Sequence, residues 1–210
     1  MVVHLHEHVL EKIRRLLPRI VEMCNTPSGM SHYLGSGKDG WVFRMFDPDD
    51  MLDRSLDRYC VKIWNDSFTH RVNEIDIHSH VTDREWKLFS TPSVIHVDYD
   101  LGCFVMEVVE GGTAFGVLMR RKLRLSSGLY DDVCGAFKEL NNGGVYHCDP
   151  HLGNFMFTDL EFEEGSDVVV EDAVIWIIDF GRSSLSRSFD DVGAVRGHLR
   201  NDSFVQAVPT

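Results

Sequence analysis

The chain has 210 residues, enough for one large domain or for two small lobes. Hydrophobic residues make up 43% of it, an ordinary share that allows a sizeable core. The formal net charge of −12 argues against binding to nucleic acid, because a protein that binds the phosphate backbone needs basic patches. The acidity favours solubility and, as an alternative, a preference for basic substrates or partners.

No membrane segment or secretion signal is predicted. No run approaches the roughly 18 consecutive apolar residues of a membrane span, and the first residues lack the basic leader and long apolar region of a signal peptide. The cysteines are odd in number and form no C-x-x-C pair, which favours free thiols in a reducing compartment. They are Cys24, Cys60, Cys103, Cys134 and Cys148. We therefore expect an intracellular, cytoplasmic protein without a membrane partner.

The first part of the chain predicts a helix, a set of strands and a second helix. Apolar residues recur at helical spacing over 4–24, where Pro18 could kink or split the helix. A second helix is expected over 67–88, with an interruption near residues 82–83. Strand patterns occupy 33–34, 41–46, 58–64, 94–97 and 103–109.

The second part, after Gly111-Gly112, is expected to be mostly helical. Helical patterns cover 127–140 and 190–199. Two short strands are expected at 155–157 and 173–178, and the acidic loop 161–167 between them is interpreted as an exposed hairpin tip. A boundary near Gly111-Gly112 would place a cleft between the two parts.

The first motif is a glycine-rich turn, residues 35–42, which reads G-x-G-x-x-G-x-V. Glycine lets backbone amides approach phosphates closely. A dinucleotide-binding turn would lead from a strand into a helix, whereas here a strand pattern follows Gly40. The motif therefore predicts a strand–loop–strand flap over nucleotide phosphates. Its candidate cofactor-binding residues are Gly35, Ser36, Gly37, Gly40 and Val42.

Lys62 follows the flap by about twenty residues and stands between Val61 and Ile63 in a strand pattern. Alone, it would be interpreted as an edge-strand lysine whose amine reaches water. After a phosphate flap, it is the candidate cation for the α- and β-phosphates. Such a lysine needs a carboxylate partner. Glu74 in the next helix is the preferred candidate, and Glu85 is the alternative.

The segment 104–112 runs from a strand pattern into a glycine pair. A connector of this kind can offer backbone N–H and C=O groups to an adenine edge. Met106, Glu107 and Val109 are the candidate cofactor-binding residues, although Met106 is equally suited to an ordinary core position.

The last two motifs read H-x-D-x-x-x-x-N at 147–154 and D-F-G at 179–181. They offer a carboxylate base, Asp149, and two oxygen ligands, Asn154 and Asp179. These groups can hold two magnesium ions and orient a hydroxyl against the terminal phosphate of ATP. We therefore expect ATP and Mg²⁺ as cofactors.

The order of these motifs resembles that of the protein-kinase superfamily. The resemblance covers about residues 34–199. It implies an α+β, two-lobed protein-kinase-like fold, with a helical extension at 1–30, a five-stranded N-lobe at 31–111 and a truncated, mostly helical C-lobe at 112–210. It also implies the Lys62–Glu74 pair, Asp149 as catalytic base, and Asn154 and Asp179 as magnesium ligands. His147 is similar to the histidine that orients the catalytic loop, and Asp190-Asp191 resembles the start of the helix that supports it.

Two departures mark an atypical member. Cys148 replaces the arginine that pairs with a phosphorylated activation loop, so such control is not expected. His151 stands where serine/threonine kinases place a lysine that neutralises the γ-phosphate, and we keep it as a catalytic candidate. Few residues follow Gly181, and there is no A-P-E motif. This short plan resembles viral, bacterial-effector, RIO and Bud32-type kinases. For a viral or bacterial-effector kinase, it implies a location in the host cytoplasm.

The favoured function is an atypical serine/threonine protein kinase with a protein substrate and an activating protein partner. One alternative is a small-molecule kinase of the aminoglycoside or choline type, because Asp149-Pro150-His151 with Gly153-Asn154 resembles those enzymes too. UbiB-type kinases share D-P-H-x-G-N but have an alanine-rich loop and a K-x-G-Q element that this chain lacks. A pseudokinase binding module is disfavoured because the motif set is complete.

Two further candidates are set aside. His4, His6 and His8 alternate, as do His78 and His80, so on a helix they point to different faces and do not favour a metal site. No Cys-His-Asn context supports Cys148 as a nucleophile.

Overall fold

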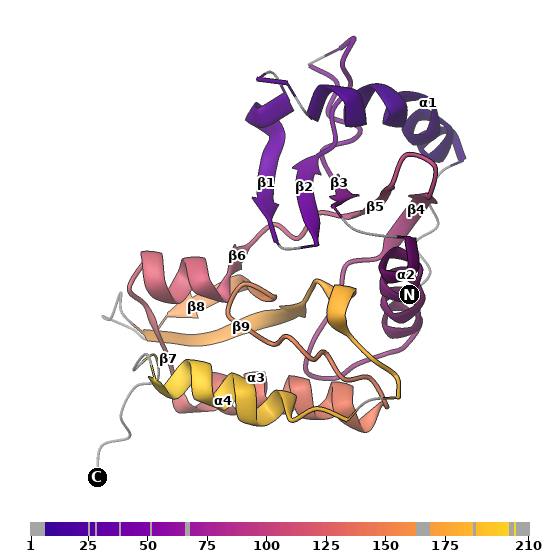
Figure 1. The fold of residues 1–210 in the computed structure, drawn as a ribbon. Coiled ribbons are helices and arrows are strands. Elements are labelled where there is room, and N and C mark those ends of the chain that lie inside the picture. Colours follow the sequence, from indigo (N-terminus) through magenta and orange to yellow (C-terminus); the bar gives the residue numbers. More distant parts are fainter. Residues whose placement is uncertain are drawn as a thin grey trace. The chain divides into compact units, whose positions relative to one another are not determined.

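A computed structural model of the chain describes residues 7–24, 26–27, 29–37, 39–50, 52–65, 68–162, 169–186, 188–201 and 204. The chain forms two compact units (Figure 1). Unit 1 comprises residues 1–83 and 92–108, and unit 2 comprises residues 84–91 and 109–210. Several predicted features lie outside the described residues: His4 and His6 at the start of the first helix, Lys38 in the glycine-rich turn, and the tip of the acidic loop at 163–167.

Unit 1 contains a five-stranded antiparallel sheet with the order β1-β2-β3-β5-β4 (Figure 1). Each strand overlaps a segment that the sequence predicts as a strand, and β-branched and aromatic residues are frequent in most of these segments. The strands are β1 (Tyr33–Ser36), β2 (Gly40–Arg44), β3 (Tyr59–Trp64), β4 (Val94–Asp98) and β5 (Cys103–Glu107). A 3-10 turn, Gly29–His32, precedes β1.

The two faces of this sheet carry different cores. Successive side chains of a strand point to opposite faces. Val61 and Val105 belong to a cluster with buried residues of α1 (Glu7–Cys24). Trp64 and Phe104 belong to a second cluster with Ile75 of α2 (Phe68–Thr82). The sheet is therefore covered by α1 on one face and by α2 on the other.

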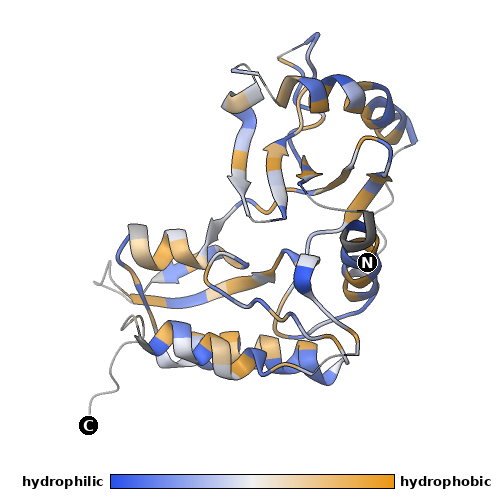
Figure 2. Ribbon diagram, viewed as in Figure 1, coloured by the Kyte–Doolittle hydropathy of each residue, from blue (hydrophilic) through white to orange (hydrophobic). Residues whose placement is uncertain are grey.

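Helix α1 is continuous through Pro18, so the predicted split does not occur. Figure 2 shows hydrophilic and hydrophobic residues side by side on this helix, as expected of an amphipathic element. Lys12 joins it to the loop after β2 through ion pairs with Asp47, at 2.9 Å, and Asp53. The buried side of α1 consists of Ile13, Leu16, Leu17, Ile20 and Cys24.

Helix α2 ends at Thr82, so the helical prediction is wrong for its last residues, 83–88. Residues 84–91 belong to unit 2. There the Lys87 and Leu88 N–H groups donate to the carboxylate of Glu139, at 3.0 Å, rather than to carbonyls one helical turn back. Tertiary contacts of this kind override the local propensity for helix.

Unit 2 contains a second sheet, with the order β6-β8-β9-β7, and two helices (Figure 1). Helix α3 (Ser127–Asn142) packs against β9 and against α4 (Asp191–Asn201). A π-helix spans Phe115–Arg120, and a 3-10 turn spans Phe180–Arg182. The strands are β6 (Gly112–Thr113), β7 (Arg124–Leu125), β8 (Phe155–Phe162) and β9 (Val169–Ile177).

Strands β8 and β9 are longer than the short strands that the sequence predicts. Only part of each strand is buried, as at Phe155 and Phe157 of β8 and Ile175 and Ile177 of β9. The remaining positions include exposed charged residues, such as Glu171 in β9. At these exposed positions the apolar pattern is too weak to predict a strand. Hydrogen bonds between β8 and β9 extend the two strands there.

Four of the five cysteines are buried, and all five are free thiols. Burial raises the pKa of the Cys24, Cys60 and Cys103 thiols to about 12, because it disfavours the thiolate. In the part of the chain that the structure describes, no helix has the length and apolar character needed to cross a bilayer.

The packing of α1 makes it part of the core of unit 1. Leu17 is 1% exposed, so Leu17→Ala is expected to lower the free energy of unfolding by about 2–5 kcal/mol through lost burial and a cavity. Arg15→Ala, at an exposed position of the same helix, is the matched control. Urea denaturation of both variants measures the difference. Equal, small effects would show that α1 is a dispensable extension.

Candidate functional site

The glycine-rich motif forms the hairpin between β1 and β2 in unit 1. A Cβ at Gly40 would lie 2.3 Å from the Ile63 carbonyl oxygen of β3, so only glycine fits there. A Cβ at Gly35, by contrast, would meet no atom within 4 Å. The backbone at Gly35 is therefore open to a close approach. The predicted flap residues all lie in this hairpin: Gly35, Ser36, Gly37, Gly40 and Val42.

Val42 lies directly opposite Lys62 in the register of β2 and β3. Directly paired residues point to the same face of a sheet. Met106 pairs with Cys60, two residues before Lys62, and packs against the cluster of Trp64 and Phe104. Val42, Lys62 and Met106 thus share the face that α2 covers.

Lys62 forms a buried ion pair with Glu74 of α2. The distance from Lys62 Nζ to Glu74 Oε1 is 2.6 Å, and the two side chains are 6% and 2% exposed. The other oxygen of the carboxylate, Oε2, accepts a hydrogen bond of 2.7 Å from the indole N–H of Trp64. Glu85, the alternative partner, lies beyond the end of α2 and is exposed. The structure therefore pairs Lys62 with Glu74 and adds Trp64, which the sequence analysis did not identify.

The connector residues Glu107 and Val109 take part in hydrogen bonds within the protein. The Glu107 N–H donates to the Ser93 carbonyl at 3.0 Å, and the Glu107 carboxylate accepts from the Ser93 N–H at 2.9 Å. The weak donor Cys60 Sγ lies 3.6 Å from the Glu107 carbonyl oxygen. Val109 is the first residue of the segment 109–210 of unit 2. Its carbonyl accepts a hydrogen bond from the Gly111 N–H at 3.0 Å.

In unit 2, the loop after α3 is held by Asp191 of α4. The backbone N–H groups of His147 and Cys148 donate to the two oxygens of this carboxylate, at 2.7 and 2.9 Å. The side-chain amide nitrogen of Asn141, turned toward Asp191, lies 2.7 Å from Oδ2. Asp191 is fully buried. Burial raises the pKa of the Asp191 carboxyl, and the two backbone donors oppose that rise.

His147 connects the loop to the D-F-G segment. Its ring Nε2 lies 2.9 Å from the Ile178 carbonyl, and its own carbonyl accepts from the Ser183 hydroxyl at 3.2 Å. A bond to a carbonyl requires that Nε2 carries the proton. Burial lowers the pKa of the His147 imidazole, which favours this neutral form. The side chain thus holds the residue that directly precedes Asp179.

Two non-glycine residues at the site have a left-handed backbone. Cys148, which directly precedes Asp149, has φ +63°, and Asp179 has φ +63°. Conformations of this kind cost about 1–3 kcal/mol and persist where the surroundings impose them. Here the Asp191 carboxylate accepts a hydrogen bond from the Cys148 N–H, and the His147 ring bonds to the Ile178 carbonyl. These two contacts impose the conformations. The backbone is therefore held in the positions that present Asp149 and Asp179.

Asp149 lies between two side chains that can carry positive charge. Its Oδ2 is 3.6 Å from Arg182 Nε and 3.9 Å from His151 Nε2. The Gly153 N–H donates to His151 Nδ1 at 3.0 Å, which requires a lone pair on Nδ1 and leaves the proton on Nε2, toward Asp149. A Cβ at Gly153 would lie 2.8 Å from the His151 ring. Arg182 was not singled out in the sequence, although its place directly after D-F-G is a usable signal.

Asn154 and Asp179 lie at the same end of the β8–β9 hairpin. Phe155 pairs with Ile177, and the Ile178 N–H donates to the Asn154 carbonyl at 3.0 Å. The Asn154 amide nitrogen donates to the Asp149 carbonyl at 2.9 Å, which turns its oxygen away from that carbonyl.

An amide oxygen and a carboxylate fit Mg²⁺, which takes few protein oxygens and completes its shell with water and phosphate. No cluster of three or more His, Cys, Asp or Glu side chains suited to a metal ion occurs among the described residues. A kinase-type pair of one asparagine and one aspartate does not require such a cluster.

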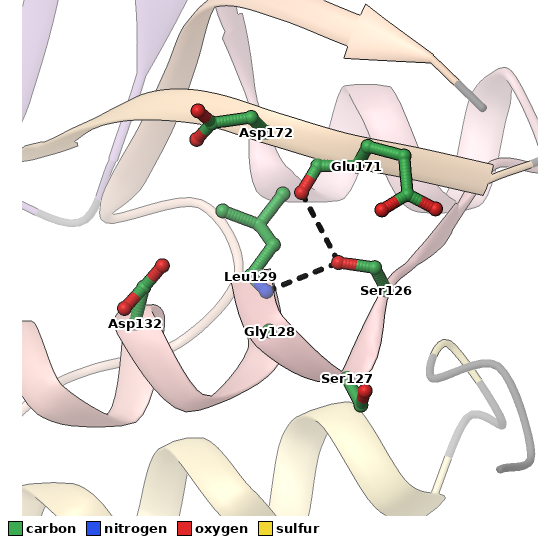
Figure 3. A pocket seen from close by; sticks show the side chains of 7 residues that line it. All are labelled: Ser126, Ser127, Gly128, Leu129, Asp132, Glu171 and Asp172. Carbon is green, nitrogen blue, oxygen red and sulfur yellow. Dashed lines mark hydrogen bonds between the residues drawn. The ribbon is translucent and has the colours of Figure 1, made fainter. Parts of the chain in front are cut away.

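A separate pocket of about 500 Å³ lies at the start of α3 (Figure 3). Ser126 and the acidic Asp132, Glu171 and Asp172 line it. The Ser126 hydroxyl caps α3 by accepting from the Leu129 N–H, and it lies 3.1 Å from the Glu171 carbonyl. None of the predicted site residues lines this pocket.

Comparison with known proteins supports the architecture. No family model matches the chain, and no curated protein matches its sequence. Among the solved structures that match is the crystal structure of the kinase domain of PF14_0431, with a TM-score of 0.52 and 17% identity. The match covers 75% of this chain and 51% of that one, so this chain spans about half the length of that kinase domain. The chain therefore has a kinase-like fold.

The role of Asp191 can be tested by comparison with its neighbour. Asp191→Asn places an NH₂ group against one of the two backbone donors. The free energy of unfolding is therefore expected to fall by about 1.5–3 kcal/mol, the value of a hydrogen bond to a charged group. Asp190→Asn is the control, because Asp190 caps the Gly193 N–H at 2.8 Å and asparagine caps as well as aspartate. Urea unfolding and amide exchange at His147 and Cys148 provide the measurements. Similar effects of both variants would refute the assigned role.

Proposed function

We propose that the protein is an ATP- and Mg²⁺-dependent phosphotransferase that transfers the γ-phosphate of ATP to a hydroxyl group. The observation that carries the proposal is the convergence in unit 2 of two segments that are distant in the sequence. One segment brings Asp149 and Asn154, the other brings Asp179, and the 3.0 Å bond from Ile178 N–H to Asn154 O joins them. Their residue types are those that phosphoryl transfer to a hydroxyl requires.

Each residue has a role that follows from its chemistry. The Asp149 carboxylate accepts the proton of the attacking hydroxyl. The Asn154 amide oxygen and the Asp179 carboxylate would hold magnesium, which supplies neutralisation of phosphate charge. In unit 1, the open backbone at Gly35 admits a phosphate, and the Lys62 ammonium contacts the α- and β-phosphates. Catalysis then rests on positioning and electrostatics rather than on a covalent intermediate.

The acceptor that we propose is a serine or threonine hydroxyl of a protein. The net charge of −12 favours a basic acceptor. Cys148, in place of an arginine, favours activity without phosphorylation of an activation loop. A cytoplasmic location with abundant Mg·ATP and an activating protein partner belong to the same proposal.

Replacement of the base tests the reaction directly. Asp149→Asn keeps the shape of the side chain but removes the proton acceptor, so kcat is expected to fall by about 10²–10⁴-fold, while Mg·ATP still raises the melting temperature. Asp159→Asn is the control, since Asp159 is exposed and its φ of +50° suits asparagine as well. Transfer of labelled phosphate from ATP to a mixed protein substrate and to a panel of small hydroxyl and amino compounds measures both activity and acceptor. Undiminished turnover of Asp149→Asn would refute the mechanism, and transfer to small compounds alone would refute the protein acceptor.

Arg182 is expected to contribute positive charge at the reacting phosphate, because it lies beside Asp149. It would take over part of the role of the lysine that His151 replaces. Arg182→Ala should lower kcat more than it raises the KM for ATP, and Arg182→Lys should restore part of the loss. Arg121→Ala, which removes an exposed arginine elsewhere in unit 2, is the control. Steady-state kinetics of the three variants would contradict the assignment if Arg182→Ala and Arg121→Ala behaved alike.

A further inference from the structure

Trp64 is part of the buried ion pair of unit 1. It follows Lys62 by two residues on β3, so both side chains lie on the face of the sheet that α2 covers. Glu74 Oε1 receives the Lys62 ammonium at 2.6 Å, and Glu74 Oε2 receives the Trp64 indole N–H at 2.7 Å. Each oxygen of the carboxylate therefore has a donor of its own, and the carboxylate cannot rotate without breaking a bond.

The indole itself is held in place by its surroundings. Its ring lies 5.2 Å from the ring of Phe104 and stacks on Tyr99, with centroids 6.3 Å apart and planes inclined by 7°. The Arg71 guanidinium of α2 lies 5.6 Å from the ring centroid, a distance at which cation–π attraction operates. The Trp64 backbone N–H also donates to the Gly102 carbonyl at 3.0 Å. Trp64 is 6% exposed, so the direction of its N–H is set by packing.

A neutral donor suits this position better than a second cation. An additional positive charge beside Glu74 would compete with Lys62 for the carboxylate, and a buried oxygen without a donor would be destabilising. The indole N–H satisfies that oxygen and leaves the negative charge of Glu74 to Lys62. It also ties α2 to β3, the strand that carries Lys62.

We propose that Trp64 is a positioning residue, which fixes Glu74 and thereby holds the Lys62 ammonium ready for the phosphates of the nucleotide without any movement of α2. This inference rests on the proposed function. The three side chains belong to one compact unit, and the contacts described above all lie within it.

The competing interpretation is that Trp64 is an ordinary core residue whose N–H happens to find an acceptor. Loss of the N–H would then affect stability alone. The two interpretations differ in what happens to Lys62 and in whether the effect depends on Glu74.

The first experiment needs no activity. In protein labelled with ¹⁵N, the indole N–H signal that disappears in Trp64→Phe is assigned to Trp64. We expect this signal to exchange slowly with water and to shift in Glu74→Gln. The ammonium signal of Lys62, assigned by its loss in Lys62→Met, should be visible in the wild type, where exchange is slow, and broadened in Trp64→Phe. An unchanged Lys62 signal in a folded Trp64→Phe would overturn the proposal.

The second experiment is a double-mutant cycle of Trp64→Phe and Glu74→Gln. We expect Trp64→Phe to lower kcat/KM for ATP about tenfold, mainly through KM, because Lys62 contacts phosphates in the ground state as well. In the Glu74→Gln background the same change should have little further effect. Trp176→Phe is the matched control, since its indole N–H donates to the neutral Thr158 hydroxyl at 3.1 Å. Equal losses in both backgrounds would overturn the proposal.

The outcomes separate this inference from the proposed function. A wild-type protein that neither binds Mg·ATP nor transfers phosphate would refute the function, while the Lys62 signal would still decide whether Trp64 orders the ion pair. An active wild type with an unaffected Trp64→Phe would refute the inference alone. If Trp64→Phe fails to fold, the Trp64 indole signal is assigned by elimination from Phe variants of the other three tryptophans, Trp41, Trp86 and Trp176. Glu74→Gln then tests the same unit from the carboxylate side, and an unshifted Trp64 signal in that variant would overturn the proposal.

Discussion

Burial of charge is the constraint on which the candidate residues of each unit depend. A carboxylate removed from water is stable only where donors replace the lost hydration. Glu74 in unit 1 has the ammonium of Lys62 and the indole of Trp64. Asp191 in unit 2 has the backbone N–H groups of His147 and Cys148. In each case a buried carboxylate holds a group or a segment that the sequence marks as a candidate for the site.

The same constraint explains why the loop in unit 2 tolerates unfavourable backbone conformations. Cys148 and Asp179 both have φ +63°, and each is adjacent to a residue held by a buried hydrogen bond. Asp191 binds the loop that contains Cys148. The imidazole of His147 binds Ile178, the residue before Asp179. These hydrogen bonds offset the strain of the two left-handed conformations.

The comparison of prediction with structure shows where sequence patterns are informative. The strands of unit 1 were predictable because short runs rich in β-branched and aromatic residues, bounded by turn residues, are a local signal. The end of α2 was not, since Lys87 and Leu88 find a partner in Glu139, about fifty residues away. Strands β8 and β9 were underestimated because their exposed faces are charged. Trp64 was missed because it has no recognisable pattern of its own, and Arg182 was missed although it directly follows D-F-G.

The sequence by itself determined the inventory of chemical groups: the glycine-rich turn, Lys62, and the H-x-D-x-x-x-x-N and D-F-G motifs, whose order resembles that of kinases. Residue types and spacing are local properties, and they suffice to name candidates. Only the tertiary structure decided which groups meet. It paired Lys62 with Glu74 rather than Glu85, supplied Trp64 as a third member, and placed Arg182 beside Asp149. The physical reason is that hydrogen bonds and ion pairs depend on distances of a few ångströms between segments far apart in the chain, and those distances arise only from packing.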